Sequence, residues 1–204
     1  MGQYYKPTAL DKNADVTAND WQPIKWQLLC YDFDELAKLM EHAYVGNYLV
    51  QAVEYLLSKD KEGVKFAWCG DYAEDYPGFT TNLFDIGDQQ ESCKEGFAEL
   101  VKDGVLTDFK GLLDKTCYRI ASPKTYKYVI NHTKKMYVEI PPQRAGELTI
   151  HPLPLLTCES NGLGGGDYYA EKGKEYVGAW KYDRISVGDE VPDNFEKLDV
   201  TFEE

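Results

Sequence analysis

The amino-acid sequence predicts an α+β fold in which a mostly antiparallel sheet, or alternatively a mixed one, packs against two or three helices. Runs of aromatic and β-branched residues, typical of strands, occur near both ends of the chain. Two further segments carry apolar residues at helical spacing. With 204 residues and a hydrophobic fraction of 43%, the chain is long enough for one sizeable core. We therefore expect residues 1–204 to form a single domain.

Three strands are expected in the first third of the chain. Residues 3–10 have aromatic and extended character, and residues 24–31 form a short apolar run. Residues 64–69 are almost entirely apolar, which indicates a strand buried on both faces. Gly70 and Asp71 follow it with residues that favour a turn.

The strongest helix signal covers residues 33–58. Asp32, with Glu35 three residues later, resembles a capping box, and apolar residues then recur at helical spacing as far as Leu56. Gly46 interrupts this stripe, so either one bent helix or two abutting helices fit the pattern.

The next segment, 71–91, is acidic and irregular, and we expect most of it to be loop. Ser92 and Glu95 form a second capping-box pattern, which predicts a short helix over residues 93–103 with Gly104 just after its end.

The second half of the chain reads mainly as strands. Residues 126–140 alternate tyrosine and β-branched residues around a polar centre, as expected for a hairpin. Residues 148–157 are extended in character, but their two prolines predict a sheet edge or polyproline conformation. Residues 176–187 predict one or two final strands, followed by an acidic C-terminal segment, 188–204.

Charge and cysteine content exclude several classes of function. Thirty-five acidic and 22 basic residues give a formal net charge of −13, which opposes direct binding to nucleic acid or to an anionic membrane. No apolar run approaches the length of a membrane span or of a signal-peptide core. Five widely spaced cysteines without a Cys-x-x-Cys pair predict reduced thiols and no zinc site. We expect a cytoplasmic protein of a bacterial host cell, with no metal and no cofactor.

A glycine cluster is the first candidate for a ligand site. Backbone without side chains can turn its N–H groups inward and hold an anion. Neither a P-loop nor a dinucleotide-binding fingerprint is present, because Asp167 and two tyrosines follow the glycines. A turn between strands is the competing interpretation. The candidate ligand-binding residues are Asn161, Gly162, Gly164, Gly165 and Gly166.

Around this loop, a histidine and two carboxylates are candidates for catalysis. His151, Glu159 and Asp167 are residue types that act as general acids and bases. Their spacing in the sequence does not by itself bring them together, and each is also expected in a purely structural role.

The acidic segments are the candidate interaction surface. Carboxylates that lack neighbouring lysine or arginine can imitate a phosphate backbone and occupy a basic groove on a partner. An ordinary solvated face is the competing interpretation. The candidate interaction residues are Asp71, Glu74, Asp75, Asp85, Asp88 and Glu91.

Several segments together resemble an uncharacterised family of small proteins from gut bacteria and their phages. The segments that carry the resemblance are MGQYYK at residues 1–6, LMEHAY at 39–44, WCGDYA at 68–73, NHTKK at 131–135, HPLPLLT at 151–157 and NGLGGGDY at 161–168. The resemblance implies a phage or mobile-element setting, and it carries no catalytic residue over to this chain.

Two hypotheses of function follow. The first is a non-enzymatic, acidic interaction protein that occupies a host protein surface, such as an inhibitor of a nucleic-acid-binding defence system of the CRISPR type. The alternative is a protein that binds or hydrolyses a nucleotide or another small phosphate ester at residues 161–167.

Overall fold

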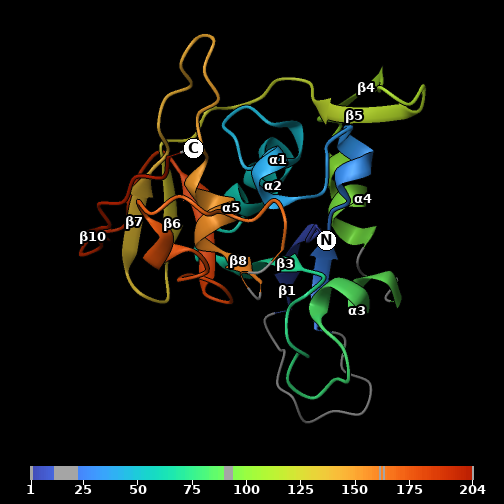
Figure 1. Ribbon diagram of the computed structural model, residues 1–204. Coiled ribbons are helices and arrows are strands. Elements are labelled where there is room, and N and C mark those ends of the chain that lie inside the picture. Colours follow the sequence, from blue (N-terminus) through green and yellow to red (C-terminus); the bar gives the residue numbers. More distant parts are fainter. Residues whose placement is uncertain (1, 12–22, 90–93, 161, 163, 204) are drawn as a thin grey trace.

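The computed structural model describes residues 2–11, 23–89, 94–160, 162 and 164–203 (Figure 1). Its main feature is an eight-stranded sheet in the order β10-β7-β6-β9-β3-β1-β2, with β8 alongside β3. In chain order these strands are β1 (Tyr5–Leu10), β2 (Ile24–Gln27), β3 (Val64–Gly70), β6 (Tyr128–Asn131), β7 (Met136–Glu139), β8 (Cys158–Glu159), β9 (Arg184–Gly188) and β10 (Glu196–Lys197). The pairings of β3 with β8 and of β10 with β7 are parallel, and the others are antiparallel. The predicted α+β fold is therefore confirmed, with a mixed, mostly antiparallel sheet.

Helices and a second, two-stranded sheet complete the described part of the chain. The helices are α1 (Leu39–His42), α2 (Tyr48–Ser58), α3 (Leu83–Gln89), α4 (Glu95–Lys102) and α5 (Pro152–Leu156), with 3-10 helices η1 (Cys30–Phe33) and η3 (Lys174–Tyr176). The small sheet is a hairpin of β4 (Leu106–Lys110) and β5 (Thr116–Ile120). Helix α2 contacts β9 of the large sheet and β5 of the small one. Figure 1 shows the hairpin at one corner of the molecule, away from β6 and β7.

The core lies between α2 and the centre of the large sheet. Every residue of β1 is buried, in agreement with a strand that has β2 and β3 as neighbours and is covered on both faces. Leu49, Val53 and Leu57 of α2 are fully buried in the same cluster as Phe66 and Trp68 of β3. Each such side chain contributes about 1.5–3 kcal/mol through burial of apolar surface.

The helix predicted at 33–58 is present as two helices, α1 and α2. Gly46, at φ +85°, separates α1 from α2, as the alternative of two helices allowed. The prediction of a capping box at Asp32 and Glu35 is wrong, because the chain there forms η1 and adopts a left-handed conformation at Asp34. The Glu35 carboxylate instead accepts a hydrogen bond from the Tyr48 N–H at 3.2 Å, so it caps the start of α2 from a distance in sequence.

Most of the described part of the acidic segment 71–91 is loop, as predicted, but it also contains α3, which was not predicted. The Asn82 side chain accepts the Asp85 N–H at 3.0 Å and donates to the Asp71 carbonyl at 3.0 Å, which starts the helix and ties it to the end of β3. The helix predicted at 93–103 is present as α4, and Gly104 follows it at φ +66°. Ser92 lies outside the described residues.

The prediction of an extended edge segment at 148–157 is also wrong for α5. Pro152 occupies the first turn of this helix, and Pro154 comes two residues later. The first N–H groups of a helix have no partner within the helix, so prolines there remove no hydrogen bond. The His151 imidazole caps the helix by accepting the Leu153 N–H at 3.2 Å.

The hairpin predicted at 126–140 is confirmed as β6 and β7. Of the strands expected at 176–187, only β9 is present, and η3 and turns precede it. The acidic C-terminal segment includes β10, which pairs with β7. The β4–β5 hairpin was not predicted, because neither of its strands shows a regular apolar alternation in the sequence.

Candidate functional sites

The glycine loop follows β8 and lies against the start of β1. The Gln3 N–H donates to the Gly165 carbonyl at 3.2 Å, and Gly2 and Gly165 form a β-bridge. Because β3 and β8 are parallel, the loop lies at the carboxyl ends of two parallel strands. This is where open sheets with parallel strands commonly bind ligands. Asn161 of the predicted site lies outside the described residues.

Two glycines of the loop have structural roles. A Cβ at Gly164 would lie 2.1 Å from the Cβ of Gln3, so only glycine allows this close approach. Gly166 adopts φ +96°, a conformation that favours glycine. The buried Asp167 closes the loop by accepting hydrogen bonds from the Tyr5 hydroxyl and, at 3.0 Å, from the Gly164 N–H. Burial raises the pKa of this carboxyl group.

His151 forms its contacts elsewhere. Its Nδ1 accepts the Leu153 N–H, and its Nε2 lies 3.1 Å from Glu54 Oε1 of α2. Both side chains are buried. Both ring nitrogens thus serve to cap α5 and to join it to α2, and neither of these partners belongs to the glycine loop.

Glu159, in contrast, lies next to the loop together with Gln3. A Cβ at Gly70 would be 2.3 Å from Gln3 Nε2 and 2.8 Å from the Glu159 carbonyl, so these groups are closely packed. Within the described part of the chain, neither polar atom of the Gln3 amide nor Glu159 Oε2 has a hydrogen-bond partner, although all three are buried. Burial raises the pKa of Glu159.

The charge of this region determines which ligands suit it. Glu159 and Asp167 are adjacent to the loop, and Asp71 follows β3 at the same edge of the sheet. Burial raises the pKa of Asp71, and Asp167 contributes in the same direction. These carboxylates would repel an anionic ligand, whereas they would attract a cationic ligand and would not repel a neutral one. Among the described residues, no group of three or more His, Cys, Asp or Glu side chains is placed to hold a metal ion.

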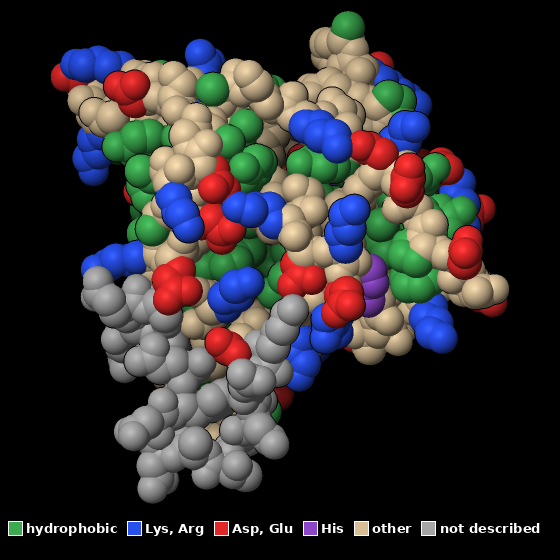
Figure 2. Space-filling model, turned by 180° about the vertical axis from the view of Figure 1, so that it is seen from behind, with side chains coloured by type: hydrophobic (Ala, Val, Ile, Leu, Met, Phe, Trp, Pro, Cys, Tyr) green, Lys and Arg blue, Asp and Glu red, His purple; other side chains and the backbone are tan. Residues whose placement is uncertain are grey.

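The predicted acidic interaction residues have mixed environments. Glu74, Asp75 and Asp85 are exposed. Asp71 is half-buried and accepts the Tyr4 N–H at 3.0 Å, while Asp88 pairs with Lys6 at 2.6 Å. Glu91 lies outside the described residues. On the face shown in Figure 2, acidic and basic side chains are interspersed, so the acidic character is spread rather than concentrated there.

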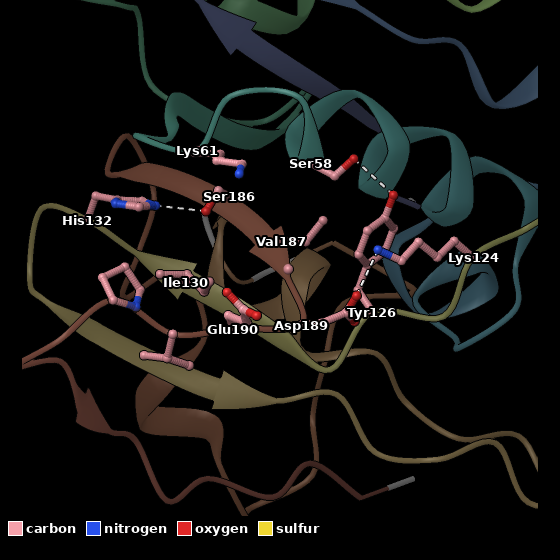
Figure 3. Close-up of a pocket in the computed structure, with 13 residues that line it drawn as sticks. Ser58, Lys61, Lys124, Tyr126, Ile130, His132, Ser186, Val187, Asp189 and Glu190 are labelled. Atoms are coloured by element: carbon pink, nitrogen blue, oxygen red, sulfur yellow. Dashed lines mark hydrogen bonds and ion pairs between the residues drawn. The ribbon is translucent and has the colours of Figure 1, made fainter.

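A cavity of about 450 Å³ lies where α2 ends above β9 and β6 (Figure 3). His132 Nε2 lies 2.7 Å from Ser186 Oγ in its wall, and burial together with Arg184 lowers the pKa of His132. The imidazole is therefore neutral at neutral pH. At the other end, Lys124 pairs with Asp189 at 2.7 Å, and Tyr126 binds Ser58 at 2.9 Å.

A second exposed feature is the turn between β4 and β5. Leu112 and Leu113 at this turn are 91% and 76% exposed, although leucine is a typical core residue. The turn is attached to the segment around η1, where both carboxylate oxygens of Asp34 accept the Leu112 N–H at 3.0 Å. That segment also exposes Tyr31 and Leu36. We call these four side chains the apolar corner.

Comparison with protein-family models, with curated proteins and with solved structures finds no match to this chain. The described part of the chain has no helix with the length and apolar character needed to cross a membrane. Its cysteines, Cys30, Cys69, Cys117 and Cys158, are free and buried.

Sequence reasoning missed both the cavity and the apolar corner. The cavity combines residues from segments more than 50 positions apart, so no local sequence motif predicts it. The apolar corner does have a local signal. Leu112 and Leu113 form an apolar pair between Lys110 and Asp114, outside any predicted helix or strand.

Proposed function

We propose that this protein acts by binding another protein, with the apolar corner as its anchor. The observation that carries the proposal is the exposure of two adjacent leucines on a turn that hydrogen bonds hold to Asp34. Folding would favour burial of such side chains, and contiguous exposed apolar groups typically mark interaction surfaces. No reaction is needed for this role.

The anchor is held in place before any partner binds. The Asp34 carboxylate accepts a hydrogen bond from the Leu112 N–H, and the Gly111 N–H donates to the Lys115 carbonyl at 2.9 Å across the turn. A Cβ at Gly111 would lie 2.5 Å from Asp34 Oδ1, so glycine permits the contact. A preorganised turn loses little conformational entropy on binding, which favours affinity.

The charge of the molecule identifies the chemistry of the partner. The net charge of −13, with exposed carboxylates at Glu74, Asp75 and Asp85, attracts a basic protein and repels an acidic one. In Figure 1, α3 and the β4–β5 hairpin lie at different ends of the molecule, so the carboxylates act by long-range attraction rather than within the apolar corner. The partner is thus a basic protein with an apolar pocket, and the resemblance to phage proteins favours a host protein.

The test is quantitative affinity purification from bacterial lysate with three forms of the protein. These are the wild type, the double variant Leu112→Ser/Leu113→Ser, and the control Leu148→Ser. Leu148 is also an exposed leucine, but it lies between β7 and α5. A basic protein should be captured by the wild type and the control, and its recovery should fall at least about tenfold with the double variant.

Two outcomes of the same experiment would contradict the proposal. If every captured protein is recovered equally with the double variant, the apolar corner is not the anchor. If the captured protein is acidic, the charge argument is wrong.

The glycine loop supports a second candidate, the binding of a small ligand. Its position at the carboxyl ends of β3 and β8 favours this role, as does the adjacent Gln3 amide, which has no hydrogen-bond partner among the described residues. A thermal-shift screen with nucleotides, other phosphate esters and cationic metabolites tests it. Stabilisation that disappears in Gly165→Val would support the ligand site, and stabilisation that persists would place the ligand elsewhere.

A further inference from the structure

The cavity in Figure 3 has two ends of different hydrogen-bonding character. Lys61, His132 and Ser186 lie at one end, and Ser58, Tyr126 and Asp189 lie at the other. Its volume of about 450 Å³ is within the range of small-molecule sites. The direction of each hydrogen bond shows what each end still offers to a ligand.

One end offers acceptors. The Ser58 hydroxyl donates to the Tyr55 carbonyl at 2.8 Å, so its oxygen must accept the hydrogen of the Tyr126 hydroxyl at 2.9 Å. The Tyr126 oxygen is then left as an acceptor. Asp189, whose charge is balanced by Lys124 at 2.7 Å, adds carboxylate oxygens at this end. Glu190 follows Asp189 and has no ion-pair partner among the described residues.

The opposite end offers donors. Lys61 is exposed at the cavity wall and has no ion-pair partner within the part of the chain that the structure describes. The neutral His132 donates from Nε2 to Ser186 Oγ in one of its two tautomers, which leaves the Ser186 hydroxyl hydrogen for a ligand. An ammonium group and a hydroxyl donor together suit a carboxylate.

Apolar side chains also line the cavity. They are Ile130, Val187, Val191 and Pro192. They suit the hydrocarbon portion of a ligand, because contact with them removes apolar surface from water.

We propose that this cavity binds a zwitterionic amino compound, with its carboxylate at Lys61 and Ser186 and its ammonium at Glu190. An inorganic phosphate or a phosphate ester suits the site less well. Asp189 and Glu190 both line the cavity, and among the described residues only Asp189 is neutralised by an ion pair, with Lys124. The site is separate from the apolar corner, so it operates whether or not the protein-binding proposal holds.

The test measures the binding of 6-aminohexanoate through the changes that it causes in the amide chemical shifts of the protein during an NMR titration. Hexanoate and hexylamine are matched probes, since each lacks one of the two charges, and inorganic phosphate is the fourth. The zwitterion should shift amides of β9 and of the segment after α2 at up to about 10 mM, and each single-charge probe should bind about tenfold more weakly.

Matched variants connect this binding to the cavity. Lys61→Met and Glu190→Gln should each weaken binding of 6-aminohexanoate by about tenfold or more, because each removes one charged contact. Lys65→Met and Glu175→Gln change exposed charges outside the cavity and should leave binding unchanged. The proposal is overturned if the zwitterion does not bind, if hexanoate or phosphate binds as tightly, or if the control variants weaken binding as much as the cavity variants.

Discussion

The imidazole of His42 accepts a hydrogen bond from the indole N–H of Trp68, with 2.8 Å between Nε2 and Nε1. Its Nδ1 lies 2.8 Å from the Leu36 carbonyl and donates to it. Both rings are fully buried and stack at 5.6 Å between centroids. The pair joins the end of α1 to the middle of β3, and it requires a neutral histidine, because a protonated Nε2 cannot accept.

The first prediction concerns acid stability. Burial lowers the pKa of His42 to about 4 from its ordinary value of 6.5. Between these values the unfolded chain binds a proton that the folded protein does not, so the free energy of unfolding falls as the pH decreases. The loss attributable to this group should be about 3 kcal/mol near pH 4.

Urea unfolding at several pH values measures this effect, with His42→Gln as the comparison. Glutamine offers an acceptor and a donor but does not titrate. The variant should therefore lose less stability than the wild type between about pH 6.5 and about pH 4. Carboxyl groups titrate in both forms, so the difference between the two curves isolates the imidazole. Parallel curves would mean that His42 is not held neutral by the fold.

The second prediction compares two glycines of the same loop. Gly164→Ala places a Cβ 2.1 Å from the Cβ of Gln3 and should cost about 1–3 kcal/mol of stability. A Cβ at Gly162 has no atom within 4 Å among the described residues, so Gly162→Ala meets only the backbone penalty of its φ of +71°, roughly 1 kcal/mol. Denaturant unfolding should rank Gly164→Ala as the more destabilising change. The reverse order would show that Gln3 does not pack against the loop in this way.

The third prediction concerns how the anchor is held. Asp34→Gly keeps a residue type that tolerates the left-handed backbone at φ 58°, and it removes both carboxylate oxygens that accept the Leu112 N–H. Hydrogen exchange of the Leu112 amide should become faster, while exchange in β1 and β3 stays unchanged. Unchanged exchange at Leu112 would remove the argument for a preorganised turn.

The fourth prediction separates binding from folding at the apolar corner. Leu112 and Leu113 contribute little buried surface, so Leu112→Ser/Leu113→Ser should change the free energy of unfolding by no more than about 0.5 kcal/mol. Chemical denaturation checks this. A large loss of stability would mean that the leucines serve the fold, and reduced capture of a partner by the variant would then carry no information.

Much of the fold could be predicted from the sequence because the signals are local. The strands at 3–10 and 64–69 and the hairpin at 126–140 carry their own apolar or alternating patterns. Helix α5 could not be predicted in this way, since prolines in the first turn of a helix look the same in sequence as prolines on a sheet edge. The start of α2 does have a local signal, because its N-cap is Asn47, whose side chain accepts the Val50 N–H at 3.2 Å. The bond from the Tyr48 N–H to Glu35, 13 residues away, is the part that no local pattern indicates.

The candidate sites show the same division. The glycine loop is visible as a cluster in the sequence, and the structure places Glu159 and Asp167 beside it. His151 precedes the loop by ten residues, but its side chain contacts Glu54, 97 residues away, because capping α5 orients its ring. The cavity depends on β9 and β6 pairing below the end of α2, a juxtaposition that follows from tertiary structure alone.

The most direct test of the protein-binding proposal is photo-cross-linking in bacterial cells with p-benzoylphenylalanine in place of Leu112. We predict one main cross-linked product with a basic protein, which is absent when the same photo-reactive residue replaces Leu148. Equal cross-linking from both positions, or none from position 112, would contradict the claim that the apolar corner is a docking surface.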